Sequence, residues 1–298
     1  MTTTVSVVFL GTGASLPSPE RNVSAAVLCS DRHLYLLDCG EGTQQRLMSA
    51  GLSPTRISSV FISHLHGDHL FGLAGYLTSQ QLLQRQELLN IYGPPGLQHY
   101  IRCMQQVAGY DLNYPVEIIE IDPGTPDRFM VNEFTVQTAG LEHKVPVIGY
   151  RFEEAEKPGK FDPEKAHALG VEPGPDRARL QGGHPVKRGS RTVYPDDVLG
   201  PPIPGRIITY CTDTRPCDAA VELARNSDLL IHESTFSDEF QERARFTQHS
   251  TAREAAQIAR SAGALRLALY HISMRFHKNS DVLLAQAGSE FASCFIPK

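Results

Sequence analysis

The most constraining feature of this sequence is a cluster of metal-ligand side chains directly after an apolar run. The run ISSVFI is typical of a buried β-strand, and it leads into SHLHGDHLFGL. Residues 64–69 contain three histidines and an aspartate, namely His64, His66, Asp68 and His69. Such a cluster is either a chance grouping in a polar loop or one end of a metal site. Further ligands elsewhere in the chain would decide between these interpretations.

The spacing within the cluster suits more than one metal ion. His64 and His66 are two residues apart, so in extended backbone their side chains point the same way. Gly67 permits a sharp turn before Asp68 and His69. One short loop can therefore present ligands in two directions.

Three more candidate ligands stand where other apolar runs end: His143 in GLEH, Asp213 in YCTD and His271 in YHIS. Taken singly, each histidine has an ordinary polar interpretation, and Asp213 suits an Asx turn. Parallel neighbouring strands, however, bring their ends to one edge of a sheet. One zinc ion needs three or four protein ligands. A larger set with one bridging carboxylate fits two ions about 3.5–4 Å apart.

The order of the predicted elements indicates an α/β fold. Apolar runs separated by turns come first, then strands alternate with segments of helical periodicity, and this order occurs twice. Such an order predicts an αββα sandwich of two mixed β-sheets with outer helices. We expect helices within residues 42–51, 70–86, 96–109, 219–227, 250–263 and 281–291.

Residues 153–204 break this pattern, because they are rich in proline, glycine and charge and have few apolar anchors. We interpret them as a long, structureless insert, which in a compact domain is either functional or disordered. Residues 177–194 contain no acidic residue but five basic ones: Arg177, Arg179, Lys187, Arg188 and Arg191. The run is either a solvated loop or a phosphate-binding arm.

Composition excludes few functions, but it indicates the cellular compartment. The net charge of −5 gives no global signal for nucleic acid or an anionic membrane, although a local basic patch suffices for RNA. The six cysteines form no CxxC pair, which favours free thiols in a reducing compartment. No basic and apolar leader opens the chain, and no apolar run approaches the roughly 18 residues of a membrane span. We expect a cytoplasmic protein with no membrane association.

The segment GTGAS, which begins at Gly11, superficially suggests a dinucleotide-binding loop. The third glycine of GxGxxG is missing, because position 16 is leucine. We therefore expect no nucleotide cofactor and interpret GTGAS as a turn near the metal site.

The motifs together resemble the ribonuclease Z family, the tRNA 3′-processing endonucleases of the metallo-β-lactamase superfamily. The segments that carry the resemblance are FLGTGASLPSPERN, LLDCGEGTQQRL, SHLHGDHLFGL, CTDTRPC, LLIHESTF, HST and YHISMRF. The resemblance covers nearly the whole chain, which implies a single metallo-β-lactamase domain over residues 1–298, with residues 153–204 as an inserted tRNA-binding arm.

The resemblance also implies roles for the candidate ligands. One Zn²⁺ is expected on His64, His66 and His143, and a second on Asp68, His69 and His271, with Asp213 as the bridge; Mn²⁺ is an alternative. Asp68 corresponds to the proton acceptor of the family, and His249, held by Glu233, to its general acid. The implied reaction is attack of metal-activated hydroxide on the phosphodiester after the discriminator nucleotide, which leaves a 3′-hydroxyl on the tRNA and a 5′-phosphate on the trailer.

The resemblance implies further contacts with precursor tRNA. In the insert, LGVEPGPDRARLQGG is similar to the Gly-Pro motif of the family's arm, and the expected contacts are Gly174, Pro175, Arg177, Arg179, Lys187 and Arg188. Arg21 and Asn22 belong to an N-terminal loop that often reads PxKxRN in the family and is associated with sensing the CCA end. Here Pro19 replaces the lysine, which leaves discrimination between CCA-less and CCA-bearing precursors open. The family is typically homodimeric, so we expect a homodimer.

Three alternatives remain on the residues alone. A small-molecule phosphodiesterase or thioesterase needs the same ligands, but it has no use for a basic insert. A di-iron oxidoreductase on this scaffold favours a carboxylate where His66 stands. A non-catalytic RNA-binding module would have lost ligands, and none of the expected ones is missing.

Overall fold

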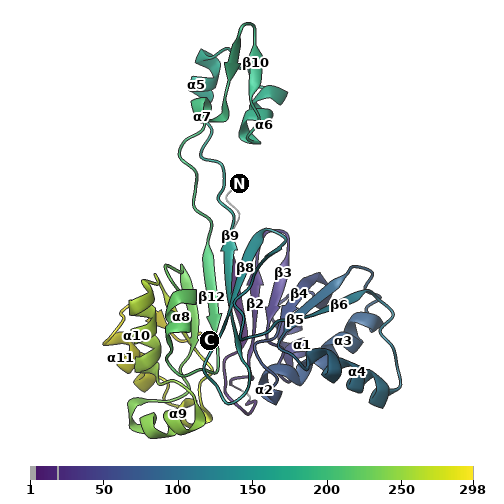
Figure 1. Cartoon of the computed structure of the whole chain (residues 1–298), viewed down its shortest axis with the longest axis vertical. Coiled ribbons are helices and arrows are strands. Elements are labelled where there is room, and N and C mark those ends of the chain that lie inside the picture. The colour runs from purple at the N-terminus through teal and green to yellow at the C-terminus, as the bar shows by residue number, and fades with distance from the viewer. Residues whose placement is uncertain (1–4, 19, 298) are drawn as a thin grey trace. The chain divides into compact units, whose positions relative to one another are not determined.

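Two β-sheets packed face to face, with helices on both outer faces, make up the body of the chain (Figure 1). The structure is a computed structural model, and it describes residues 5–18 and 20–297. The predicted αββα sandwich is confirmed. The described residues separate into two compact units, of which the first is this sandwich (5–18, 20–130, 136–152 and 207–297).

The first sheet has the strand order β1-β2-β3-β4-β5-β6. Its strands are β1 (Ser6–Gly11), β2 (Ala25–Cys29), β3 (Leu34–Leu37), β4 (Ile57–Phe61), β5 (Leu89–Gly93) and β6 (Val116–Glu120). Strands β1, β2 and β3 pair antiparallel, whereas β3 to β6 pair parallel. The parallel pairs need crossover connections, which are supplied by α1 (Thr43–Ser49), α2 (Gly67–Leu70), α3 (Gly72–Leu82) and α4 (Leu97–Ala108).

The second sheet has the order β15-β14-β13-β12-β9-β8-β7. Its strands are β7 (Arg128–Val131), β8 (Phe134–Gly140), β9 (Ile148–Glu154), β12 (Ile207–Cys211), β13 (Leu229–Glu233), β14 (Leu267–Tyr270) and β15 (Cys294–Phe295). Strands β12 to β15 pair parallel. Their crossovers carry α8 (Asp218–Leu223), α9 (Gln241–Thr247), α10 (Ala252–Ala262) and α11 (Asp281–Gly288).

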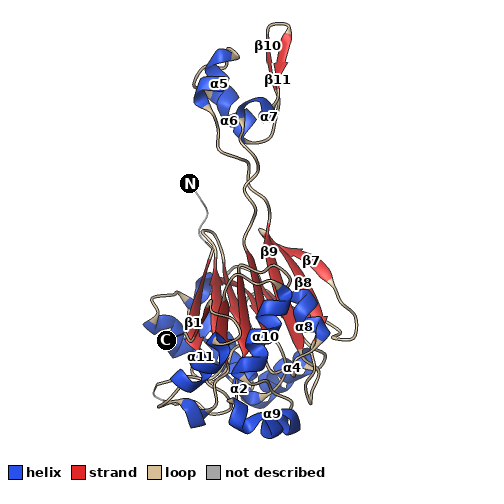
Figure 2. Ribbon diagram, turned by 90° about the vertical axis from the view of Figure 1, so that its left-hand side faces the viewer, coloured by secondary structure: helices blue, strands red, loops and turns tan. Residues whose placement is uncertain are grey.

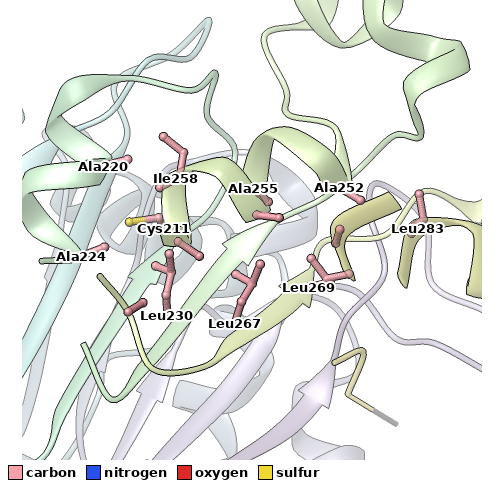
Figure 3. Packing of buried hydrophobic residues seen from close by; sticks show 14 of the residues in the cluster. Cys211, Ala220, Ala224, Leu230, Ala252, Ala255, Ile258, Leu267, Leu269 and Leu283 are labelled. Carbon is pink, nitrogen blue, oxygen red and sulfur yellow. The ribbon is translucent and has the colours of Figure 1, made fainter. Parts of the chain in front are cut away.

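Each sheet packs one face against helices. Figure 2 shows α8, α10 and α11 over the outer face of the second sheet. Small side chains let these helices approach closely, and Figure 3 shows strand residues such as Leu230 and Leu269 packed beneath Ala255 and Ile258. Helices α1, α3 and α4 cover the first sheet through a cluster that includes Leu47, Tyr76 and Ile101.

Aromatic side chains fill the layer between the sheets. Phe61 of β4 stacks on Tyr92 of β5 at a centroid distance of 4.8 Å. Two rings of the second sheet meet Phe61 edge-on, Phe152 at 4.9 Å and Tyr150 at 5.3 Å. Edge-to-face and offset contacts of this kind stabilise by about 0.5–1.5 kcal/mol each beyond area burial. The layer fixes the two sheets relative to each other, and with them the strand ends that carry the site.

The second unit comprises residues 131–135 and 153–206, and we call residues 153–206 the insert. The expectation of a structureless insert is wrong. It contains α5 (Pro163–Ala168), α6 (Pro175–Gln181), α7 (Pro195–Val198) and the hairpin of β10 (Val186–Arg188) and β11 (Arg191–Val193). A core of six buried apolar residues holds these elements together: Ala166, Val171, Leu180, Val186, Val193 and Val198.

Two expectations from composition can be compared with the structure. None of the helices within residues 5–18 and 20–297 is both long and apolar enough to cross a membrane. All six cysteines are free thiols, as predicted.

Candidate metal centre

The seven predicted ligands lie at strand ends on one edge of the sandwich. His64 follows β4, and His66 is the residue before α2, whose first turn carries Asp68 and His69. The ligands from distant sequence follow strands of the second sheet: His143 comes after β8, Asp213 after β12 and His271 directly after β14. Strands β12, β13 and β14 run parallel, so the segments that carry Asp213 and His271 meet at this edge, near α2 and α9 in Figure 1.

The carboxylate of Asp213 lies between two pairs of histidines. Its Oδ2 is 3.5 Å from His64 Nε2 and 3.9 Å from His143 Nε2. Its Oδ1 is 3.3 Å from both His69 Nε2 and His271 Nε2. One oxygen thus faces each pair, which is the arrangement that a carboxylate needs to bridge two cations.

Among the described residues, three groups of ligand atoms could each hold a metal ion, with the atoms of a group within 4.8 Å of one another. The first group is His64, His66, His143 and Asp213, and the second is Asp68, His69 and His271. The third group shares Asp213 and His271 with the other two and adds His249. In the second group, Asp68 Oδ2 lies 3.2 Å from His271 Nε2 and 3.7 Å from His69 Nε2.

Several ligand nitrogens have no hydrogen-bond partner in the part of the chain that the structure describes, and they are available to bind a metal. The Nε2 atoms of His64, His69 and His143 are buried and have no hydrogen-bond partner among the described residues. A buried polar atom without a partner costs roughly 1–3 kcal/mol. Imidazole nitrogen and carboxylate oxygen are ligands that divalent transition metals accept. The cluster therefore indicates a divalent metal site.

Hydrogen bonds on the far side of the rings hold four of these histidines. The Nδ1 atom of each lies near a fixed oxygen: His64 with Ser63 Oγ at 3.0 Å, His69 with Asp38 Oδ2 at 2.7 Å, His143 with the Gln248 carbonyl at 2.8 Å and His271 with Thr235 Oγ1 at 3.0 Å. A carbonyl only accepts, so the proton of neutral His143 is on Nδ1 and its Nε2 lone pair faces the centre.

The charges of the cluster suit metal binding. Burial and the neighbouring His69 lower the pKa of His64 well below its ordinary value, and burial also lowers the pKa of His143. Although burial opposes ionisation of Asp213, His271 and His69 hold the pKa of its carboxyl well below the usual range. The shifts of His64, His143 and Asp213 favour the neutral imidazoles and ionised carboxylate that metal ligation requires. His69 differs, because Asp213 and Asp38 outweigh its burial and raise its pKa well above the ordinary value.

Asp38 is the hub of the second layer around the ligands, and sequence analysis missed it. Its buried carboxylate accepts hydrogen bonds from the Ser63 amide at 2.7 Å, the Ser63 hydroxyl at 2.8 Å, the Tyr210 hydroxyl at 2.7 Å and His69 Nδ1 at 2.7 Å. It joins both sheets to a ligand. The signal was present, because Asp38 ends the apolar run LYLL as the ligands end theirs.

Backbone conformation at this edge is unusual. Asp38, Asp213, Gln248 and His271 all have positive φ, at 55°, 45°, 59° and 54°. Residues other than glycine rarely adopt this conformation, which costs of order 1–3 kcal/mol each where it is strained. The surrounding packing therefore holds two ligands and two supporting residues in place at a cost in stability.

His249 and Glu233 lie beside the ligands as a hydrogen-bonded pair. His249 Nδ1 is 2.9 Å from Glu233 Oε1, and the His249 ring stacks on that of His271 at 5.4 Å. Glu233 is fully buried and also accepts from the Thr214 amide at 2.7 Å. Burial disfavours the imidazolium, but the charge and hydrogen bond of Glu233 outweigh it and raise the pKa of His249 to about 9. His249 thus carries a proton near neutral pH.

Known proteins resemble this chain over nearly its full length. It is 41% identical to a ribonuclease Z of Methanosarcina acetivorans over 290 residues, which are 97% of this chain and 94% of that protein. It is 40% identical to a ribonuclease Z of Geobacillus kaustophilus over 98% of this chain and 99% of that one. The chain belongs to the ribonuclease Z family.

Solved structures and a family profile add to this. The human tRNase Z, short form, matches with a TM-score of 0.68 and 31% identity over 90% of this chain and 93% of that one. The metallo-β-lactamase fold protein YhfI from Bacillus subtilis, at 20% identity and a TM-score of 0.70 over 98% of this chain and 95% of that one, shares the fold. A profile described as anti-Pycsar protein Apyc1 matches residues 5–114, which include the His64–His69 segment.

In this ribonuclease Z family member, Arg215 links two parts of the site. One is the edge of the sandwich that carries the ligands, which we call the metal edge. The other is the segment around His249 between α9 and α10, which we call the His249 loop. Its guanidinium donates to both carboxylate oxygens of Glu254, at 2.6 and 3.0 Å, and to the His249 carbonyl at 2.5 Å. Glu254 also completes a capping box with Thr251 at the start of α10. Arg215 is two residues from Asp213, so one side chain links a ligand segment to the general-acid candidate.

The GTGAS segment lies beside the predicted metal site, as expected. The Ser15 amide donates to Asp68 Oδ2 at 2.7 Å, and the Ala14 amide to the Ile272 carbonyl at 3.0 Å. Gly11 is required by close packing, because a Cβ there would lie 1.8 Å from the Val23 carbonyl oxygen.

The N-terminal loop residues hold this segment from behind. Arg21 donates to Thr12 Oγ1 at 2.7 Å, and Asn22 Nδ2 to the Glu41 carbonyl at 2.7 Å. Arg21, Asn22 and Arg46 line a cavity of about 320 Å³. Pro19, on which the question of CCA sensing depends, lies outside the described residues.

Some of the predicted RNA-contacting residues have partners within the insert, whereas others are exposed to solvent. Arg177 donates to the Val171 carbonyl at 3.0 Å and lies over the Phe161 ring, and Arg188 forms an ion pair with Asp176. The other two basic side chains, Arg179 and Lys187, are exposed, as is Arg191. Gly174 and Pro175 form the start of α6, where Gly174 has a φ of 150° and Pro175 takes the first helical position.

Proposed function

We propose that this chain is a metal-dependent endoribonuclease that removes the 3′ trailer from precursor tRNA. The observation that carries the proposal is the Asp213 carboxylate, one oxygen of which faces each of two histidine pairs at 3.3–3.9 Å. Membership of the ribonuclease Z family supplies the reaction, which is hydrolysis of a phosphodiester with a 3′-hydroxyl left on the tRNA.

Two Zn²⁺ ions are proposed as cofactors, with Mn²⁺ as the alternative. His64, His66 and His143 would hold one ion and Asp68, His69 and His271 the other, with Asp213 shared between them. Divalent cations bound there would supply Lewis acidity, which activates water near pH 7 and offsets negative charge on phosphate oxygens.

Two side chains at the proposed metal site are assigned to the two proton transfers of the reaction. Asp68 is proposed as the proton acceptor, and its Oδ2 is oriented by the Ser15 amide. His249 is proposed as the donor to the departing 3′ oxygen, because Glu233 raises the pKa of His249 to about 9 and so keeps it protonated. Glu233 fixes the ring by accepting from its Nδ1 at 2.9 Å.

The insert is proposed to bind the body of the tRNA. Exposed Arg179 and Lys187 supply phosphate contacts, whereas Gly174 and Pro175 shape the start of α6 for close approach of the backbone. Arg177 and Arg188 would act partly through the fold of the insert, given their internal partners. Recognition by shape and phosphates is the usual mode for folded RNA. Arg21 and Asn22 are proposed to act nearer the cut, along the cavity that they line.

A homodimer in the cytoplasm is proposed as the working form. Helices α3 and α4 cover one face of the first sheet and end in exposed apolar side chains, Leu82, Leu83 and Val107. Exposed apolar side chains of this kind suit association with a second copy. Light scattering coupled to size-exclusion chromatography should return twice the mass of the chain, and a monomer would overturn this part.

The experiment that tests the function uses two precursor tRNAs with 3′ trailers, one with CCA and one without. Wild-type protein and Asp68→Ala are incubated with each, and the ends are mapped. We expect metal-dependent cleavage after the discriminator by the wild type and none by the variant. The ratio between the precursors measures CCA sensing with Pro19 in place. Turnover of a simple phosphodiester or thioester without tRNA cleavage would instead establish a small-molecule hydrolase.

A further inference from the structure

One aromatic side chain near the metal edge is left in solvent. Phe246, on α9, is 79% exposed, and Lys144 Nζ lies 5.0 Å from the centroid of its ring. Scattered exposed apolar residues are normal on protein surfaces, so exposure alone carries no argument. A role for Phe246 is instead inferred from its position, from its contact with Lys144 and from its small contribution to packing.

The fold makes little use of the Phe246 ring. Helix α9 is anchored by Ala244, which is buried in the cluster beneath α10. The neighbouring Phe240 packs on Phe236 and Phe276 at centroid distances of 6.3 and 6.0 Å. Phe246 is not part of this apolar cluster, so a smaller residue there would leave the anchoring contacts in place.

Phe246 and Lys144 extend two segments that already meet at the site. His143 Nδ1 donates to the Gln248 carbonyl at 2.8 Å, and the His143 and His249 rings are 5.0 Å apart. Lys144 directly follows His143, and Phe246 is three residues before His249, a stretch of chain that spans at most about 10 Å. The backbone at Phe246 therefore lies within about 10 Å of that at His249, and Lys144, whose ammonium contacts the Phe246 ring, is the chain neighbour of the ligand His143.

We propose that Phe246 is a stacking platform for a nucleobase that flanks the scissile phosphate, and that Lys144 contacts the phosphate next to that base. This inference rests on the proposed function and adds a substrate subsite to it. Stacking suits an enzyme that meets different bases at this position, because every base offers a π-face. On the same helix the exposed Arg243 and Arg245 outnumber the one exposed carboxylate, Glu242, so the helix carries a net positive charge.

The test compares Phe246→Ala with Phe246→Trp, and with Leu265→Ala as a matched loss of another exposed apolar side chain (63% exposed). We expect kcat/KM for precursor tRNA to fall about tenfold in Phe246→Ala, mostly through KM, and to be restored by tryptophan. Leu265→Ala should behave as wild type. Equal thermal unfolding of all four proteins would exclude a folding defect.

Abasic substrates identify the base and separate stacking from an indirect effect. Precursors carry an abasic position at the discriminator, at the first trailer nucleotide or far along the trailer. The tenfold defect of Phe246→Ala should disappear with one of the two flanking abasic precursors and persist with the distal one. A defect of equal size on all three precursors, or no defect on the intact one, would overturn the platform. If wild type cleaves no precursor at all, the proposed function itself fails.

A binding measurement without cleavage gives an independent readout. With chelator present, 2-aminopurine at the flanking position found above should be quenched on binding to wild type and to Phe246→Trp, but not to Phe246→Ala. Lys144→Ala should reduce the slope of log affinity against log salt concentration by about 0.7, the value for one phosphate of a single strand. Unchanged quenching in Phe246→Ala would contradict the proposal.

Discussion

Charged side chains are buried at the metal edge but exposed on the insert. At the edge, the carboxylates of Asp38, Asp213 and Glu233 are at most 2% exposed, and each has several close partners. In the insert, Arg179, Lys187 and Arg191 lie in solvent over a core of six apolar residues. Buried, cross-braced charges are preorganised and cost stability, whereas exposed ones cost little and exchange partners readily.

The comparison suggests a division of labour. A reaction at phosphorus needs groups held to within about 0.5 Å, which a fixed strand edge can provide. Binding a large folded RNA needs many weak phosphate contacts, which need no such precision. Substitutions at the edge should therefore change the chemical step and metal content, and substitutions in the insert should change affinity and salt dependence.

The largest effect is expected for Asp213→Asn. The variant loses the only group that faces both histidine pairs within the part of the chain described, so metal content and kcat should fall together. Loss of several kcal/mol of metal-based stabilisation corresponds to at least about 10³-fold in rate. Mass spectrometry of bound metal and precursor-tRNA kinetics measure both. Asp218→Asn, at an exposed carboxylate, is the matched control. Full metal content with full activity in Asp213→Asn would refute the bridging role.

Asp38→Asn should have the next largest effect, because Asp38 contacts a ligand without being one. Its carboxylate accepts four hydrogen bonds, and an amide oxygen with one NH₂ group cannot satisfy the same donors. Metal affinity should fall about 10- to 100-fold. Unfolding free energy should fall by about 1–3 kcal/mol. Competition with a chromophoric chelator and urea titration measure these quantities. A change in stability with no change in metal affinity would reduce Asp38 to a structural role.

Arg215→Lys and Glu254→Gln should affect turnover while leaving metal content alone. Lysine cannot reproduce the two-pronged contact with Glu254 together with the His249 carbonyl, so the His249 loop loses its fixed position. We expect kcat to fall about tenfold with KM little changed, because a misplaced acid affects the transition state and not binding. Arg253→Lys, which changes a half-exposed arginine on the same helix as Glu254, is the control. A rise in KM with constant kcat would indicate that the clamp serves binding instead.

The same contrast explains what the sequence could predict. Ligand residues at strand ends were recognisable because a histidine or an aspartate follows each of the apolar runs of β4, β8, β12 and β14. The parallel pairing of β12, β13 and β14 brings two of those ends together. Asp38 ends a run in the same way, but its role depends on contacts with Tyr210 and His69 across the sandwich, which no local pattern encodes.

The structure of the insert was missed for a different reason. Its core residues are small and scattered over positions 166–198, so no segment shows strong periodicity. Proline was interpreted as a sign of irregular structure, yet Pro163, Pro175 and Pro195 each begin a short helix. Proline is favoured at the first helical position because its missing amide hydrogen would have no partner there. That signal was available in the sequence.

The smallest effects are expected for single charges of the insert, and they test its side of the comparison. Arg179→Ala, Lys187→Ala and Arg191→Ala should each weaken precursor-tRNA binding a few-fold and lower the salt slope by about one, with kcat at saturation unchanged. Arg177→Ala should differ, because its guanidinium donates to Val171 and lies over Phe161 inside the insert. We expect Arg177→Ala to raise proteolysis of the insert as well as KM. If all four variants change only the salt slope, Arg177 is a phosphate contact like the others. If none of the variants changes the salt slope, the insert does not bind RNA through these charges. Its exposed basic run is then a solvated surface.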